Sequence, residues 1–93
     1  MAQNTTITLT PGVWTQLTNA DVNTITFQNV SDYYVFVKGT ADATAPTDAS
    51  GSIRVRPNYG EANVLMTDLF PGLTAKRLWA FSNEAAEVMV SHA

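Results

Sequence analysis

The sequence of 93 residues contains no cysteine, and this absence excludes disulfide bonds, thiol catalysis and thiolate metal sites. It is also poor in charge, because only 14% of its residues are Asp, Glu, Lys or Arg, against about 25% in an average soluble domain. The five Lys and Arg residues are outnumbered by eight Asp and Glu, which gives a net charge of −3. A chain that neutralises phosphates needs clustered cations, so the composition argues against a nucleic-acid partner.

Long apolar runs are absent as well. No stretch approaches the roughly 18–20 residues that span a bilayer, and residues 1–6 have neither the basic start nor the apolar core of a signal peptide. These absences predict synthesis in the cytoplasm and no membrane partner. The length fits a single domain over residues 1–93. A chain of this size buries only about 60–65% of its unfolded surface, so a compact core or neighbouring subunits must stabilise it.

What the sequence does contain is alternation of apolar and polar residues, the pattern of β-strands. In residues 23–29, the clearest case, Ile25 and Phe27 should point to the core. Residues 33–39 are apolar on both faces, which is typical of a strand that is central in a sandwich or covered by another chain. Strands are predicted at residues 6–10, 13–18, 23–29, 33–39, 52–56, 77–82 and 87–91, with a short strand or turn at 64–66 and the end of a strand at 57–61.

About eight short strands and no helix predict an all-β fold, a single antiparallel β-sandwich or jelly-roll-like domain. A parallel sheet would need helical crossovers for which the chain has no room. We expect residues 1–6 to form an extended N-terminal arm that reaches over a neighbouring subunit. Residues 40–51 contain no large apolar side chain, and we expect a flexible surface loop there.

Residues suited to catalysis are few. His92 is the only histidine, and so close to the C-terminus we expect it to face solvent or a neighbouring chain, without the partner and pocket that a general base needs. Asp42 and Asp48 share one loop, but their spacing does not match a calcium-binding loop, and local turn hydrogen bonds are the simpler interpretation. The sequence therefore predicts no enzyme activity, no metal site and no cofactor.

Two groups of side chains are candidates for an interface. Arg54 and Arg56 lie at i and i+2 of one predicted strand and should present adjacent guanidinium groups on one sheet face. Three environments suit these two arginines: a solvated face, salt bridges within the sheet, or pairing with carboxylates of another subunit. Several aromatic residues fall opposite the aliphatic side of their strands, where they suit a core, a subunit interface or a platform for a sugar ring. The candidate interface residues are Arg54, Arg56, Tyr34, Phe36, Trp79 and Phe81.

Much of the chain resembles the small β proteins of tailed-phage and prophage structural modules. The segments that carry the resemblance are ITLTPGVWTQL (7–17), ITFQNVS (25–31), VFVKGT (35–40), FPGL (70–73), RLWAFS (77–82) and VMVSHA (88–93). The resemblance implies a non-enzymatic virion protein, specifically a capsid decoration (cement) protein that forms a homo-oligomer, with a trimer favoured. Its expected partners are the major capsid protein or other virion proteins. The alternative is a tail or fibre module that binds a host-surface glycan through Trp14, Tyr34 or Trp79.

Overall fold

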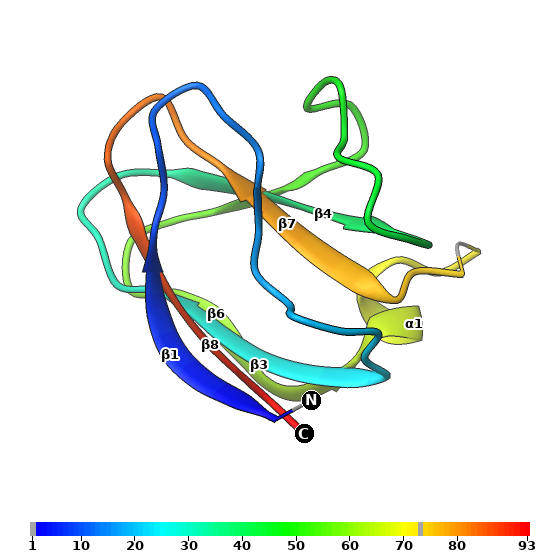
Figure 1. Cartoon of the computed structure of the whole chain (residues 1–93). Coiled ribbons are helices and arrows are strands. Elements are labelled where there is room, and N and C mark those ends of the chain that lie inside the picture. The colour runs from blue at the N-terminus through cyan, green and yellow to red at the C-terminus, as the bar shows by residue number, and fades with distance from the viewer. Residues whose placement is uncertain (1, 73) are drawn as a thin grey trace.

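The structure, a computed structural model, describes residues 2–72 and 74–93, and these form eight strands and one helical turn (Figure 1). The elements are β1 (Gln3–Thr8), β2 (Thr15–Gln16), β3 (Thr24–Asn29), β4 (Val35–Thr40), β5 (Ile53–Val55), β6 (Gly60–Leu65), α1 (Met66–Leu69), β7 (Arg77–Phe81) and β8 (Glu87–His92).

The strands form two antiparallel sheets of four strands each, packed face to face as a sandwich. The first, which we call the β3 sheet, has the order β1-β8-β3-β6, and the second, the β4 sheet, has the order β2-β7-β4-β5. Figure 1 shows the two layers crossing, with the start of β1 beside the end of β8. The predicted all-β antiparallel sandwich is confirmed.

Alternating residues of both sheets build the core between them. Ile25 and Phe27 of β3 are buried, as predicted, and Val35 and Val37 of β4 face them from the other sheet. Because side chains in a strand alternate between the two faces, the intervening residues point outward. The sandwich therefore shares one interior and has two independent outer faces.

The predicted N-terminal arm is wrong for residues 3–6. They begin β1, which pairs with β8 of the same chain from Gln3 opposite His92 to Thr8 opposite Glu87. Threonine-rich segments suit strands, and this pairing satisfies backbone groups of both strands. Met1, the first residue of the predicted arm, lies outside the described residues.

Several strand boundaries also differ from the sequence-based expectation, and two of the differences bear on how the sheets pack. β6 begins at Gly60, where a strand was expected to end, and a Cβ at this position would collide with the backbone of Phe27 on β3. Met66 starts the single turn of α1, because its buried side chain and that of Phe70, four residues on, enter the core from the same side. Leu73, the last residue of the FPGL segment, lies outside the described residues.

The connection between β4 and β5 is a surface loop, as expected, and its aspartates make local turn hydrogen bonds. The Asp42 carboxylate accepts the N–H of Thr44 at 2.9 Å, and the Asp48 carboxylate accepts the N–H of Ser50 at 3.1 Å. These bonds confirm the interpretation of the two aspartates as turn-forming residues. The flexibility of the loop stays a prediction.

Candidate functional site

A row of aromatic rings crosses the outer face of the β4 sheet. Phe36 on β4 lies directly opposite Phe81 on β7 and Arg54 on β5. The ring centroids of Phe36 and Phe81 are 6.5 Å apart, and Trp14 extends the row with its ring 5.2 Å from that of Phe81. We call Trp14, Phe81 and Phe36 the aromatic row. All three side chains are partly exposed, so the row is a surface feature of the folded chain.

Two tyrosine–arginine pairs lie beside β5, at the edge of the β4 sheet. The guanidinium carbon of Arg54 is 4.9 Å from the ring centroid of Tyr34, and that of Arg56 is 5.1 Å from the ring centroid of Tyr59. Both distances lie within the range of a cation–π contact. The Tyr34 side chain is 54% exposed, which makes it the most accessible aromatic group of the predicted interface.

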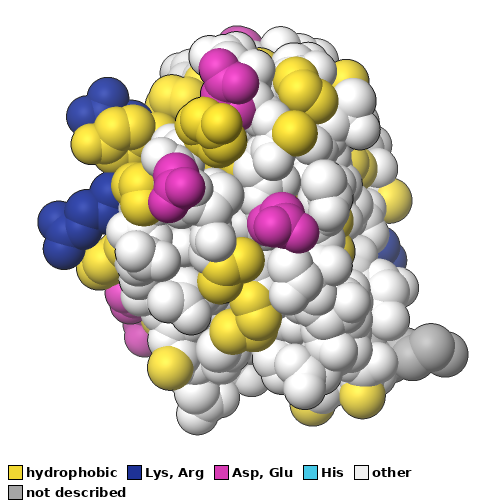
Figure 2. Space-filling model, turned by 90° about the vertical axis from the view of Figure 1, so that its left-hand side faces the viewer, with side chains coloured by type: hydrophobic (Ala, Val, Ile, Leu, Met, Phe, Trp, Pro, Cys, Tyr) yellow, Lys and Arg dark blue, Asp and Glu magenta, His cyan; other side chains and the backbone are white. Residues whose placement is uncertain are grey.

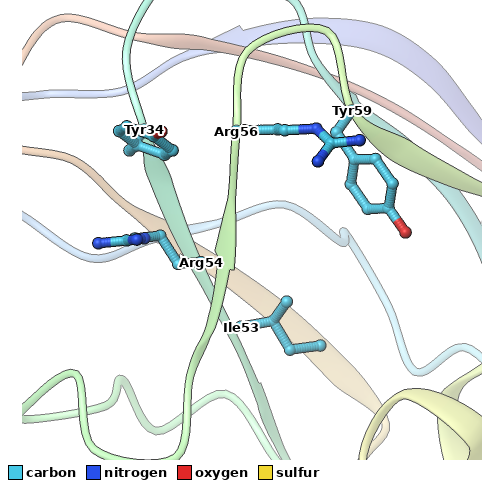
Figure 3. Close-up of a pocket in the computed structure, with 5 residues that line it drawn as sticks. All are labelled: Tyr34, Ile53, Arg54, Arg56 and Tyr59. Carbon is cyan, nitrogen blue, oxygen red and sulfur yellow. The ribbon is translucent and has the colours of Figure 1, made fainter.

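The prediction that the two arginines present adjacent guanidinium groups on one sheet face is wrong. Figure 3 shows Arg54 and Arg56 extending to opposite sides of β5, each toward its own tyrosine. β5 ends at Val55, and the chain then turns toward the other sheet, with the N–H of Tyr59 donating to the carbonyl of Arg56 at 3.2 Å. The turn removes Arg56 from the regular alternation of the strand.

An open pocket of about 590 Å³ lies between the two pairs and is lined by Tyr34, Ile53, Arg54, Arg56 and Tyr59 (Figure 3). Ion pairs in residues 2–72 and 74–93 join Lys38 to Asp48 and Arg77 to Asp21. Arg54 and Arg56 therefore pair with no carboxylate of the described chain. Each guanidinium is held against a ring while it keeps N–H donors suited to a carboxylate.

Asn29 positions these groups, and no sequence pattern singled it out. Its side chain is buried on the inner face of β3, where Nδ2 donates to the carbonyls of Tyr33, at 2.6 Å, and Val55, at 3.1 Å. Its Oδ1 accepts the backbone N–H of Ser31 at 3.0 Å, and its own N–H donates to the carbonyl of Tyr59 at 2.9 Å. One side chain and its backbone thus tie together the turn before Tyr34, the end of β5 and the turn that carries Tyr59.

Two more hydrogen bonds fix the tyrosines. The hydroxyl of buried Ser82 donates to the carbonyl of Tyr34 at 3.1 Å, which joins the start of β4 to the end of β7. The hydroxyl of Tyr59 donates to Oε2 of Glu61 at 3.0 Å. This bond to the Glu61 carboxylate raises the pKa of Tyr59 above its ordinary value, because the bond is lost when the phenol ionises.

Trp79, also predicted for the interface, lies on the outer face but is only 7% exposed. It stands between Gln16 and Lys38 in the register of the sheet, and its indole N–H donates to the hydroxyl of Thr40 at 2.8 Å. A partner or a sugar ring cannot stack on it without displacing these neighbours. The structure therefore brings together Tyr34, Phe36, Phe81 and Arg54, places Arg56 beside them, and covers Trp79.

The prediction that His92 faces solvent or a neighbouring chain is wrong. It is 8% exposed, with Nε2 3.1 Å from Oε1 of Gln3 on β1. The alternation that buries Val88 and Val90 continues to His92 and turns it to the inner face of β8. Among residues 2–72 and 74–93, no three His, Asp or Glu side chains come close enough together to hold a metal ion. No helix of the described chain has the length and apolar character needed to cross a membrane.

Comparison with protein-family models, with curated proteins and with solved structures found no match for this chain.

Proposed function

We propose that this chain is a non-enzymatic structural protein that assembles through the outer face of the β4 sheet. The observation that carries the proposal is the aromatic row on the outer face of the β4 sheet, with the exposed Tyr34–Arg54 pair on that face and the Tyr59–Arg56 pair at its edge. Tyrosine, tryptophan and arginine are the residues that most often dominate binding energy in protein interfaces. Charged residues are depleted in interface centres, and this sequence is sparsely charged throughout.

In its specific form, the proposal is a capsid decoration protein of a tailed phage, located in the virion. Its support is the resemblance of the strand segments to small β proteins of phage structural modules. The proposed partners are further copies of the chain, as a homo-oligomer with a trimer favoured, and the major capsid protein or other virion proteins. No cofactor, nucleic acid or membrane enters this role.

The size of the surface sets the expected strength of a single contact. Covering about 500 Å² of apolar surface gives about 12 kcal/mol of gross stabilisation. Lost rotational and translational freedom and side-chain ordering cost about 4–15 kcal/mol. One contact is therefore weak by itself. A particle surface on which many copies are held at once turns weak contacts into stable attachment by raising the effective concentration.

The alternative is a tail or fibre module that binds a host-surface glycan through Trp14, Tyr34 or Trp79. Burial of Trp79 removes one of these platforms, and Phe81 lies against the ring of Trp14. Tyr34, at 54% exposure, is the side chain that keeps this alternative open. The rings of the aromatic row are tilted against one another by 39° and 52° and do not form a flat platform, so the face supports protein contact better.

Immunogold labelling of purified virions tests the proposal directly. We expect label distributed over the head and heat-induced genome release at a lower temperature in particles that lack the protein. Adding back Phe36→Ser with Phe81→Ser should fail to restore heat resistance. A matched control, Met89→Ser on the outer face of the β3 sheet, should restore it. Label confined to the tail tip would refute the decoration role and favour the glycan alternative.

A further inference from the structure

We propose that the surface around Tyr34 joins two copies of this chain, with Arg54 and Arg56 of one copy paired with Asp32 and Glu84 of another. The inference rests on the proposed assembly function and names the partner and the contacts for the same face. It follows from two neighbouring pockets of opposite charge, one of which contains the arginines described above.

The acidic half of this surface is a second open pocket, of about 390 Å³, on the other side of Tyr34. Its lining includes the exposed carboxylates of Asp32, in the turn between β3 and β4, and Glu84, in the turn between β7 and β8. Neither carboxylate takes part in an ion pair with the described residues. Tyr34 and Arg54 line both pockets, so the basic and acidic halves lie side by side.

Figure 2 shows this mixture of charges on the end of the molecule that lies at the left of Figure 1. Acidic side chains stand among hydrophobic ones there, and basic side chains project from one edge. The exposed rings nearby belong to Tyr33, Tyr34 and Tyr59, which are 46%, 54% and 42% exposed. Tyrosine supplies large contact area at low cost in side-chain entropy. The surface thus offers both signs of charge and apolar area between them.

Within one chain, the arginines form no ion pairs with these carboxylates. Arg54 borders the acidic pocket, yet its guanidinium is held over the ring of Tyr34 and forms no ion pair with Asp32 or Glu84. A guanidinium fixed in this way has already lost much of the freedom that binding would cost. It can bind a carboxylate of another molecule through two parallel N–H···O hydrogen bonds, the geometry that arginine favours.

A second copy fits better than an unrelated acidic partner, because the same surface supplies both halves of the contact. Two molecules with a net charge of −3 each repel one another at long range. Association then depends on an orientation in which opposite charges face each other, and such complementarity fixes the register of an interface. Placing the basic half of one copy on the acidic half of the next achieves this.

Charge reversal tests the inference in solution. The acidified variant carries Arg54→Glu and Arg56→Glu, and the basified variant carries Asp32→Lys and Glu84→Lys. Sedimentation velocity over a concentration series should show that each variant alone self-associates about tenfold or more weakly than the wild-type chain. Mixing the two in equal amounts should restore association, because the reversed charges then face each other across every mixed contact.

The matched control carries Asp68→Lys and Glu87→Lys, an identical change in net charge at exposed positions outside both pockets. It should associate like the wild type and should not bind the acidified variant more tightly than the wild type does. Circular dichroism of each variant checks that the sandwich is folded, and recovery of association in the mixture shows the same for the interface. Raising the salt concentration to 0.5 M should weaken association of the wild type.

A wild-type chain that stays monomeric to 1 mM, or variants that fail to associate when mixed although the wild type does, would overturn the inference. The proposed function is tested separately on particles. Monomers that still bind and stabilise the head overturn the inference and leave the proposed function standing. Association that charge reversal abolishes and mixing restores, in a protein that never binds particles, supports the inference and refutes the decoration role.

Discussion

The outer faces of the two sheets differ in composition, although the inner faces of both sheets are mainly aliphatic. On the β3 sheet the outward residues of β3 are Thr24, Thr26 and Gln28, which are small or polar. On the β4 sheet the equivalent positions of β4 and β7 include Phe36 and Phe81. Both sheets bury aliphatic side chains inward. The inward side chains form the shared core, so the aromatic outer face of one sheet is the feature on which the proposed assembly role rests.

The largest effect is expected when truncation of a phenylalanine in the interior is compared with truncation of a phenylalanine on the outer face. Phe27→Ala removes a buried ring and should lower the free energy of unfolding by about 3–5 kcal/mol. Phe36→Ala removes a partly exposed ring and should cost about 1 kcal/mol. Urea denaturation of the two variants measures both values. Equal losses would show that the aromatic row belongs to the core.

Asn29 links the shared interior to the aromatic face, and its loss should have the next largest effect. Asn29→Ala leaves the buried carbonyl of Val55 without its side-chain donor and should cost about 1–3 kcal/mol. The pairing of Arg54 and Arg56 with their tyrosines should loosen at the same time. Gln28→Ala is the control, because its single side-chain bond, to the carbonyl of Asn58, is exposed. Similar denaturation midpoints for the two variants would contradict the positioning role.

Acid should release a contact between the β4–β5 loop and the outer face of the β4 sheet. The hydrogen bond from Lys38 and the N–H of Ser50 hold the pKa of Asp48 below its ordinary value. A lowered pKa in the folded chain means that the contact stabilises the fold above the ordinary aspartate range and is lost as pH falls through the lowered value. The loop should then leave Lys38, which stands beside Trp79.

The indole N–H resonance of Trp79 in NMR spectra recorded from pH 6 to pH 2 measures this release. Asp48→Asn should show the same change already at pH 6. The resonance of Thr6, which lies opposite Met89 on the outer side of β1, should stay in place over this range. Acid-induced shifts that are equal on both sheets would indicate global unfolding and would contradict a local release.

The smallest effect is expected on the polar face itself. Thr6→Ala and Thr8→Ala remove exposed side chains from β1 and should change the free energy of unfolding by about 0.5 kcal/mol or less each. Self-association should be unchanged, since neither residue lies on the β4 sheet. Sedimentation of the double variant checks this. Loss of association would place a contact on the β3 sheet.

Alternation of residue types predicted the interior well, because Ile25, Phe27 and their counterparts obey a period of two that local sequence shows directly. This alternation does not predict contacts between segments that are distant in the sequence. Residues 3–6 become a strand only because residues 89–92 lie beside them at the other end of the chain. The partners of Asn29 lie in segments that follow it, and one of them, Val55 at the end of β5, is 26 residues away.

The candidate site shows the same division. Tyr34, Phe36, Phe81 and Arg54 are on the predicted face, since strand alternation places them there. Arg56 departs because the strand ends one residue earlier, a boundary that depends on the turn toward β6. Trp79 is covered because Thr40 lies within reach of its indole N–H. Periodicity shows which face a side chain occupies, while its exposure depends on neighbours from other strands.

The pairing of Gln3 with His92 also has a consequence for circular permutation of the chain. The two ends of the described strands lie together at one edge of the β3 sheet (Figure 1). A short linker should join them, and new ends opened in the exposed loop between β4 and β5 should leave both sheet orders intact. A guest peptide inserted at the old junction would then be carried at the edge of the β3 sheet, apart from the aromatic row.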